Sequence, residues 1–172
     1  MIVCPFGAIE KGKKKIGTIY KGKNYNVNFF SAETEIGLEE ESPVVNALKQ
    51  HIKNIEKDYD YILFDTSPGA HCNVISALQG CDLAFSVTEP TPLGQHDLEL
   101  SLKLLKKLKI PSQIILNKSD VGDKNLIKKI AKSYNSKIIS EIPYRKSILK
   151  QYSEGKPIKD KAIKQIVRKL KK

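Results

Sequence analysis

Four short apolar runs, separated by segments with helical periodicity, constrain the fold of this 172-residue chain more than any other feature. The runs lie at residues 61–64, 83–87, 113–116 and 136–139. Helical patterns follow over residues 73–80, 95–108, 123–134 and 145–154. Continuous apolar runs of this length are typical of parallel strands that are buried on both faces. The alternation therefore predicts a three-layer α/β fold, with a mainly parallel sheet and helices on both faces.

The residues ahead of the first run follow a different pattern. Apolar and polar residues alternate over 16–20 and 25–29, on either side of Gly22-Lys23-Asn24. This arrangement predicts a β-hairpin or a pair of short strands. Ser42 and Pro43 then suit the N-cap and the first position of a helix. The rhythm of the chain changes to helix–strand alternation from residue 42 onward.

The formal net charge is +11, and lysine supplies nearly all of the positive charge. Arg145 and Arg168 are the only arginines. Surfaces that recognise nucleic acid usually rely on arginine for bidentate contacts to phosphates and bases. The composition therefore favours a solvated, lysine-rich surface, and we expect no specific nucleic-acid partner. Binding of DNA through the lysines is the alternative, and it would weaken steeply with salt.

The cysteines and the hydropathy pattern bear on the cellular compartment. Cys4, Cys72 and Cys81 are too few and too scattered for a disulfide framework, which suits a reducing environment. No apolar run reaches the length of a membrane span, and the N-terminus lacks the apolar core of a signal peptide. We expect a cytoplasmic protein.

Residues 158–170 form an amphipathic pattern with an apolar face surrounded by lysines. A basic helix of this kind can lie on an anionic membrane. It has no Trp or Phe that would anchor it in the membrane interface. We therefore favour a last helix that packs on the sheet and keeps its charges in water over membrane contact.

Ligands of doubly wound sheets bind beyond the carboxyl ends of the strands, so the residues there are the candidate site. Asp65 ends the first apolar run, and a carboxylate there can hold Mg²⁺ beside a nucleotide phosphate. The backbone of the Pro68-Gly69 turn could approach a γ-phosphate. The alternative is an ordinary strand-end aspartate that caps the next helix.

Asn117-Lys118-Ser119-Asp120 follows the third run and matches the pattern N-K-x-D. An asparagine amide can bond a purine, a lysine stem can pack on its face, and an aspartate can accept hydrogen bonds from guanine. The alternative is an Asx-turn in which Asp120 helps to start the next helix. The pattern gains weight because it comes two strands after a strand-end aspartate.

These residues resemble those of a known family. The span from Tyr59 to Glu99, with ILNKSD, EIPY and YSEGKPI downstream, is similar to MinD/ParA-type P-loop ATPases. Within them it most resembles the branch with an inserted ferredoxin domain. The resemblance implies binding and hydrolysis of ATP with Mg²⁺, and often a homodimer. It implies that Asp65 organises Mg²⁺ and water and that Pro68 and Gly69 sense the γ-phosphate. Asn117, Pro143 and Tyr144 would contact adenine.

CPFGAI at residues 4–9 resembles the closing cysteine of a bacterial ferredoxin motif. Cys4 would then be an iron–sulfur ligand only in a longer protein, because one thiolate cannot hold a 4Fe-4S cluster. We therefore expect no cluster in this chain. The resemblance divides the chain into residues 1–41, a remnant of the ferredoxin-like insertion with the following hairpin, and residues 42–172. The second part would be the C-terminal part of the nucleotide-binding α/β domain.

The chain departs from the family pattern at the phosphate loop. No G-K-G-G or G-x-x-x-x-G-K-[ST] sequence occurs in the 172 residues. Without that loop, the backbone amides and the lysine that hold phosphates are absent. We therefore expect an incomplete P-loop NTPase fold that is a poor ATPase alone. The alternative is a non-catalytic subunit or relic binding module that works with a separately encoded N-terminal half.

The N-K-x-D pattern leaves a GTPase as a second alternative. Such enzymes usually pair it with a D-x-x-G turn. Here Gly69 lies four residues after Asp65, not three, a spacing that resembles the MinD/ParA turn. Adenine is therefore favoured over guanine.

Overall fold

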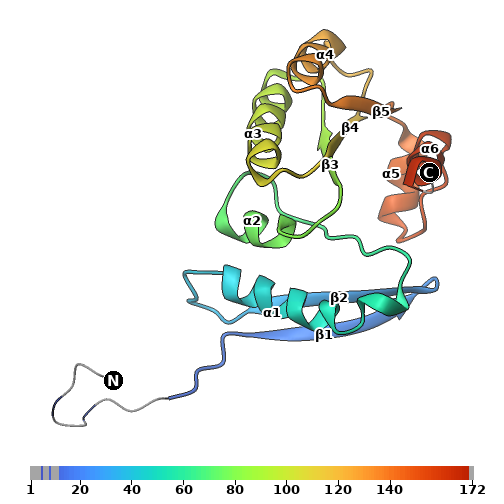
Figure 1. Ribbon diagram of the computed structural model, residues 1–172. Coiled ribbons are helices and arrows are strands. Elements are labelled where there is room, and N and C mark those ends of the chain that lie inside the picture. The colour runs from blue at the N-terminus through green and yellow to red at the C-terminus, as the bar shows by residue number, and fades with distance from the viewer. Residues whose placement is uncertain (1–4, 6–7, 9–11, 171–172) are drawn as a thin grey trace. The chain divides into compact units, whose positions relative to one another are not determined.

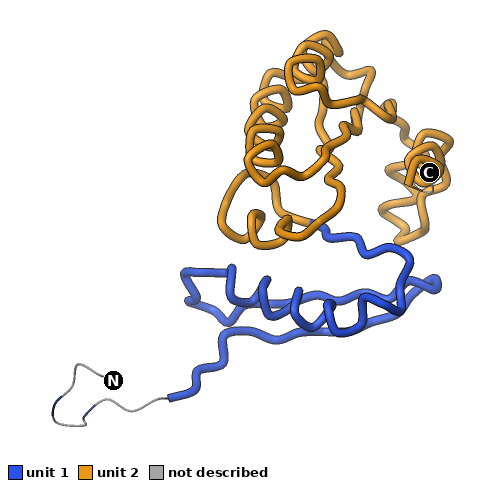
Figure 2. Tube along the Cα trace, in the orientation of Figure 1, with its two compact units in different colours: residues 1–65 blue, residues 66–172 orange. Residues whose placement is uncertain are grey.

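The computed structural model describes residue 5, residue 8 and residues 12–170 (Figure 1). The chain forms two compact units, residues 1–65 and residues 66–172 (Figure 2). Contacts between elements define these units, whereas the division expected after residue 41 rests on family resemblance. That division stays a prediction. Cys4 lies outside the described residues.

The first unit is a hairpin with one helix packed against it. Strands β1 (Gly17–Asn24) and β2 (Val27–Thr34) pair antiparallel over their whole length. The turn is made by Tyr25 and Asn26, which have φ angles of 47° and 63°. A two-residue hairpin turn with both central residues at positive φ matches the twist of the strands. The hairpin prediction is confirmed, but Gly22 to Asn24 pair within β1 and do not form the turn.

Helix α1 (Ser42–Lys53) packs against β2 and is followed by a short 3₁₀ helix, η1 (Glu56–Asp58). The N-cap position belongs to Glu41, so the prediction of Ser42 as N-cap is wrong by one residue. Ser42 is the first helical residue, and its backbone N–H donates to Glu40 Oε1 at 3.0 Å. Pro43 lies in the first turn of α1, where a missing backbone N–H costs no helical hydrogen bond.

The expected strand at residues 61–64 is not part of any sheet. The segment is extended, and 76% of Leu63 is exposed. An apolar run becomes a buried strand only where neighbouring strands supply hydrogen bonds and helices cover its faces. The described residues place no strand beside this run. The prediction of a strand here is therefore wrong for this structure.

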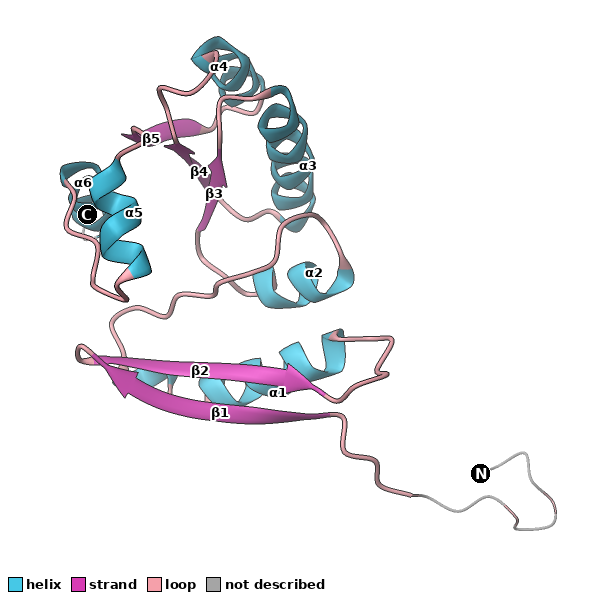
Figure 3. Ribbon diagram, turned by 180° about the vertical axis from the view of Figure 1, so that it is seen from behind, coloured by secondary structure: helices cyan, strands magenta, loops and turns pink. Residues whose placement is uncertain are grey.

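The second unit contains a parallel three-stranded sheet with the order β3-β4-β5. The strands are β3 (Ala84–Thr88), β4 (Ser112–Asn117) and β5 (Lys137–Ile142). The helices are α2 (Cys72–Leu78), α3 (Pro92–Leu108), α4 (Lys124–Ser133), α5 (Lys146–Ser153) and α6 (Lys161–Leu170). Helices α3 and α4 cover one face of the sheet, and α5 and α6 lie on the other side (Figures 1 and 3). This arrangement confirms the predicted three-layer α/β fold.

The core lies between β4 and the helices α3 and α4. Ile114 and Leu116 of β4 are fully buried against Leu98, Leu102 and Ile127. Burying side chains of this size contributes about 1.5–3 kcal/mol each, so this cluster is a principal source of stability in the second unit. It fixes β4 as the central strand and thereby positions the strand ends described below.

Helix α6 packs against β5, in agreement with the interpretation of residues 158–170 as a helix on the sheet. Ser140 Oγ donates to the carbonyl of Ala162 at 2.9 Å, and Lys169 Nζ donates to the carbonyl of Ile139 at 2.8 Å. Among the described residues, no helix has both the length and the hydrophobicity needed to cross a bilayer.

Candidate functional site

The carboxyl ends of the three parallel strands bring three predicted segments to one edge of the sheet. Residues 88–92 follow β3, residues 117–120 follow β4, and residues 142–144 follow β5. In sheets of this type the strand ends and the loops after them form the ligand site. The structure therefore brings Asn117, Pro143 and Tyr144, the predicted base contacts, to the same edge.

An ion pair joins the end of β3 to the end of β4. Lys118 Nζ lies 2.7 Å from Glu89 Oε1, and both side chains are partly exposed. Lys118 has a φ of 44°, a left-handed conformation that is uncommon outside glycine and asparagine. The lysine of N-K-x-D is thus engaged with a carboxylate of the neighbouring strand end. No spacing in the sequence identifies Glu89 as the partner of Lys118, and only the pairing of β3 with β4 brings the two side chains together.

Two hydrogen bonds join the end of β4 to the end of β5. The backbone N–H of Ser119 donates to the carbonyl of Ile142 at 3.0 Å, which continues the pairing past the strands. The backbone N–H of Tyr144 donates to Asp120 Oδ1 at 2.7 Å. Asp120 therefore holds the loop after β5 by one of its two carboxylate oxygens. The alternative in which Asp120 helps to start the next helix is wrong for this structure, because Asp123 caps α4 and the partner of Asp120 lies 24 residues away.

The loop after β3 is packed closely by two glycines. A Cβ at Gly122 would lie 1.9 Å from the carbonyl oxygen of Pro90, and one at Gly94 would lie 2.3 Å from that of Glu89. Neither distance is compatible with a side chain unless the backbone moves. The hydroxyl of Thr88 also donates to the carbonyl of Gly94 at 2.7 Å. These contacts hold the segments after β3 and β4 close together.

Asn117 differs from its neighbours in the motif. Its side-chain amide is half-buried at the end of β4, and no other described residue hydrogen-bonds to it. An asparagine amide offers both donors and an acceptor, which is the combination that a purine edge requires. Asn117 is therefore the group at this edge that is available for a base.

The residues predicted to act on phosphate and metal are placed differently. Asp65 is exposed and is the last residue of the first unit, whereas Pro68 and Gly69 belong to the second. Gly69 has a φ of 97°, and a Cβ there would lie 3.2 Å from the ring of His71. The turn therefore requires glycine, as the predicted Pro-Gly turn implies.

ATP with Mg²⁺ requires oxygen ligands for the metal, a contact for the base and donors for the phosphates. Within the described part of the chain, no three acidic, histidine or cysteine side chains are grouped closely enough to hold a metal. Mg²⁺ often takes one or two carboxylates together with nucleotide phosphates, so Asp65 fits a metal that arrives with a nucleotide. The base end of a nucleotide fits the strand-end edge. The phosphate end does not, because Lys118 is paired and no glycine-rich loop follows a described strand.

A second link at this edge was not predicted from the sequence. Asp160 is 95% buried by its side chain, accepts from Arg145 at 2.5 Å and accepts from the backbone N–H of Ala162 at 2.8 Å. It thereby caps α6 and ties it to the residue that follows Tyr144. The position of an aspartate just before a helical pattern is the signal that could have identified it.

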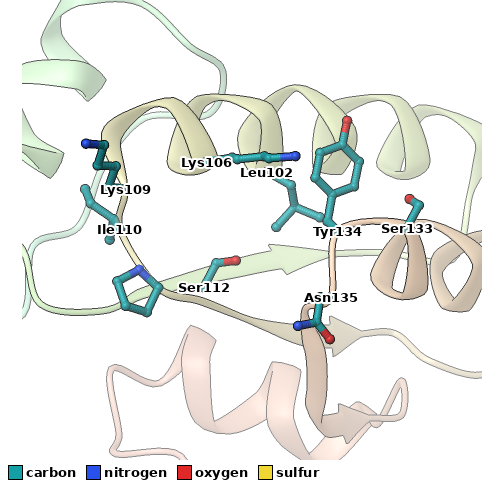
Figure 4. A pocket seen from close by; sticks show the side chains of 9 residues that line it. Leu102, Lys106, Lys109, Ile110, Ser112, Ser133, Tyr134 and Asn135 are labelled. Atoms are coloured by element: carbon teal, nitrogen blue, oxygen red, sulfur yellow. The ribbon is translucent and has the colours of Figure 1, made fainter.

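A hollow of about 610 Å³ lies at the opposite edge of the sheet, around the amino end of β4 (Figure 4). It is lined by the end of α3 and the end of α4, with Lys106, Lys109, Ser112, Tyr134 and Asn135 among its side chains. It is open, and it contains none of the predicted site residues. The ligand rule for parallel sheets points to the other edge.

The parallel sheet, with helices on both faces and a candidate site at the carboxyl ends of its strands, defines a doubly wound α/β domain of the kind that binds nucleotides. Residues 24–118, more than half of the chain, match the family described as AAA domain, AAA_31. The chain belongs to this family. The matched span includes Asp65, Pro68, Gly69 and Asn117 and ends before Pro143 and Tyr144.

Two relatives from Methanocaldococcus jannaschii are similar over most of the chain. "Uncharacterized protein MJ0579" is 34% identical over 143 residues, which are 83% of this chain and 49% of that protein. "Uncharacterized ATP-binding protein MJ0685" is 27% identical over 118 residues, which are 67% of this chain and 47% of that protein. The chain thus spans about half the length of the curated relatives that it matches.

Solved structures of MinD share the fold. MinD of Aquifex aeolicus is 24% identical with a TM-score of 0.60, covering 75% of this chain and 60% of that one. The cell division ATPase MinD of Pyrococcus furiosus is 21% identical with a TM-score of 0.62, covering 81% of this chain and 59% of that one. At this identity the likeness establishes the fold alone.

Proposed function

We propose that this chain is the C-terminal, base-binding portion of a MinD-like ATPase and does not hold ATP by itself. The observation that carries the proposal is the strand-end edge. Three strand ends are joined to one another, and the Asn117 side-chain amide, unlike the Lys118 and Asp120 side chains, makes no hydrogen bond within the described residues. One relative is described as ATP-binding, which agrees with this assignment.

Each predicted residue has its own task in binding the nucleotide. Asn117 bonds the adenine edge, and Pro143 and Tyr144 border the base. The Pro68-Gly69 turn meets the γ-phosphate, and Asp65 holds Mg²⁺ or the attacking water. Carboxylates and backbone amides in such positions act by orientation and by electrostatic stabilisation of the transferred phosphoryl group.

Adenine is supported over guanine by the bonds that the motif already makes. Recognition of guanine requires the aspartate of N-K-x-D to accept two N–H groups. In this structure Asp120 Oδ1 accepts from the backbone of Tyr144, and Lys118 is held by Glu89. GTP binding through N-K-x-D remains the second candidate, and the motif itself is the feature that favours it.

Titration of the isolated chain with labelled ATP and excess Mg²⁺ tests whether it binds ATP by itself. We expect no binding tighter than about 1 mM, which corresponds to only ~4 kcal/mol. Tighter binding would contradict the claim that a separate phosphate loop is needed.

The base assignment is tested by NMR with adenosine and guanosine at millimolar concentration, because nucleosides need no phosphate loop. We expect the side-chain amide signals of Asn117 to shift with adenosine and not with guanosine. The matched control is Gln113, which lies on the same strand four residues earlier. A shift with guanosine alone would favour the GTPase.

Two further assignments rest on resemblance. We propose that the complete protein carries a ferredoxin domain with 4Fe-4S clusters, to which Cys4 contributes a ligand. We also propose that it works as a homodimer or with a separately encoded N-terminal half. Reconstitution with iron and sulfide tests the first, because the chain alone should develop no cluster absorbance. Sedimentation with and without nucleotide tests the second.

A further inference from the structure

The hollow at the amino end of β4 lies between the last turns of two helices. Lys106 and Lys109 come from the end of α3, whereas Tyr134 and Asn135 directly follow α4 (Figure 4). The residues proposed to bind a nucleotide lie at the carboxyl ends of the strands, which form the other edge of the sheet. A ligand in the hollow would therefore be independent of the proposed function.

The floor of the hollow is apolar. Leu102 and Ile110 line it and are otherwise buried in the second unit. Tyr134 packs against the core cluster to which Leu102 belongs. A volume of about 610 Å³ accommodates a large apolar side chain, and covering this floor would remove apolar surface from water.

The rim of the hollow is positively charged. The ammonium groups of Lys106 and Lys109 make no ion pair or hydrogen bond with another described residue. None of the nine residues that line the hollow is acidic. Free ammonium groups beside an apolar floor favour a ligand that carries carboxylates next to an apolar group.

Lys109 has a backbone conformation that is unfavourable for lysine. Its φ is 58°, and its N–H donates to the carbonyls of Leu105 and Lys106, which ends α3. Glycine usually occupies this position, because a Cβ is unfavourable in the left-handed region. A lysine retained where glycine would fit better points to a use for its side chain.

The side chain of Asn135 adds a polar group that suits a peptide. Its amide has no hydrogen-bond partner among the described residues. It offers two N–H donors and one carbonyl oxygen, which are the groups that bond a peptide backbone. The φ of Asn135 is 51°, a conformation that asparagine tolerates.

We propose that this hollow is a docking site for an acidic peptide segment of a partner protein. One large apolar side chain of the segment covers Leu102 and Ile110, and its carboxylates pair with Lys106 and Lys109. The hollow is open, so an extended segment can pass across it. A small-molecule site would enclose most of its ligand.

Lysines near the end of a helix also have a purely structural use, because they stabilise the partial negative charge of the helix C-terminus. This use accounts for Lys106, which lies in the last turn of α3. It does not require a lysine at position 109, where the left-handed conformation favours glycine. Lys109→Gly therefore separates the structural use from docking.

NMR titration of the full chain with the peptide Glu-Asp-Leu-Asp-Glu, blocked at both ends, tests the location. We expect the side-chain amide signals of Asn135 to shift and to saturate. Asn125, at the other end of α4, is the matched control and should not shift. Asn117 should not shift either, because it lies at the opposite edge of the sheet. Equal shifts at all three asparagines would overturn the docking site.

Two altered peptides test the chemistry of the ligand. With alanine in place of leucine, we expect about fivefold weaker binding, because less apolar surface is covered. With glutamine and asparagine in place of the acids, binding should be lost, and added salt should weaken binding of the parent peptide. Equal affinities of the leucine and alanine peptides would overturn the docking site, since charge alone would then account for binding.

Variants of the lysines test the rim. Lys106→Gln and Lys109→Gly should each weaken peptide binding about threefold, whereas Lys109→Arg should bind as the parent does. Lys128→Gln, on an exposed lysine of α4 that does not line the hollow, is the matched control and should leave affinity unchanged.

The urea unfolding midpoint of Lys109→Gly distinguishes docking from the structural use. We expect the midpoint to stay the same or rise, because glycine removes the unfavourable left-handed lysine, while peptide affinity falls. A lower midpoint with unchanged affinity would overturn the docking site and show that Lys109 serves the helix end alone.

Discussion

Lys118 and Asp120 show how a motif that is associated with nucleotide binding can be used within the fold. Both side chains bond to neighbouring strand ends, one to Glu89 and one to the backbone of Tyr144. Side chains in such positions align the loops of the site. The residue that they leave available, Asn117, is the one that the resemblance assigns to adenine.

Replacing Asp120 tests its bond to the loop after β5. Asp120→Ala removes the acceptor for the Tyr144 N–H, and we expect a loss of about 1–2 kcal/mol in the free energy of unfolding. Asp120→Asn keeps an oxygen at the same position and should lose less than half as much. Urea unfolding followed by circular dichroism measures both. Equal losses in the two variants would show that the charge matters and the hydrogen bond does not.

Among the described glycines, Gly122 has the least space for a side chain. A Cβ there would lie 1.9 Å from the carbonyl oxygen of Pro90, so Gly122→Ala must displace backbone. We expect it to cost at least about 2 kcal/mol in the free energy of unfolding. Gly12→Ala, where no heavy atom lies within 4 Å, should change stability by less than about 0.5 kcal/mol. Comparable unfolding midpoints for both variants would contradict the close approach.

Helix α3 is the longest element that the structure describes. Two residues one turn apart on its exposed side, Glu99 and Lys103, form an ion pair. Lys103 Nζ lies 2.9 Å from Glu99 Oε1, with the glutamate nearer the helix N-terminus, which is the favourable order. The hydrogen bond and charge of Lys103 hold the pKa of Glu99 below its ordinary value. The same pair raises the pKa of Lys103.

The pair predicts the direction of two pH effects on α3. Because the pKa of Glu99 is lowered by folding, its stabilisation is present above the ordinary glutamate range and is lost as pH falls through the lowered value. The contribution of Lys103 is lost as pH rises through its raised pKa. In Lys103→Gln, the NMR titration midpoint of the Glu99 carboxyl should rise. It should stay where it is in Lys107→Gln, and a rise in both would assign the effect to net charge.

At the scale of the whole molecule, two compact units are joined through an extended segment around Asp65. Tyr61, Leu63 and Phe64 are exposed there and lie outside any sheet. Parallel-sheet proteins normally bury such a run. The exposure of this run follows from the lack of a partner strand beside it among the described residues.

We expect the exposed segment at residues 61–64 to be the first site of limited proteolysis. Chymotrypsin should cut first at residues 61–64, because an exposed extended segment fits a protease more readily than a helix does. Leu100, exposed within α3, is the control site and should be cut later. Mass spectrometry of the early fragments measures the order. A first cut at Leu100 would show that residues 61–64 are protected in solution.

Much of the second unit was predictable, because its strands and helices are encoded by short-range pattern. The runs at 83–87, 113–116 and 136–139 each start within one residue of an observed strand, and the ends of the predicted helices lie within three residues of the observed ones. The conformation of residues 61–64 was not predictable in this way, because an apolar run forms a strand only where a partner strand lies beside it. The site residues Asn117, Pro143 and Tyr144 could be proposed from their position after strands.

By itself, the sequence determined the order of elements, the three-layer class and the edge at which a ligand site would lie, because hydrophobic periodicity and strand direction are local properties. The tertiary structure alone decided which polar side chains at that edge are engaged. Lys118 with Glu89, Asp120 with Tyr144 and Asp160 with Arg145 join residues that are distant in the chain. Such pairs depend on which strands are neighbours, and no spacing along the chain encodes that.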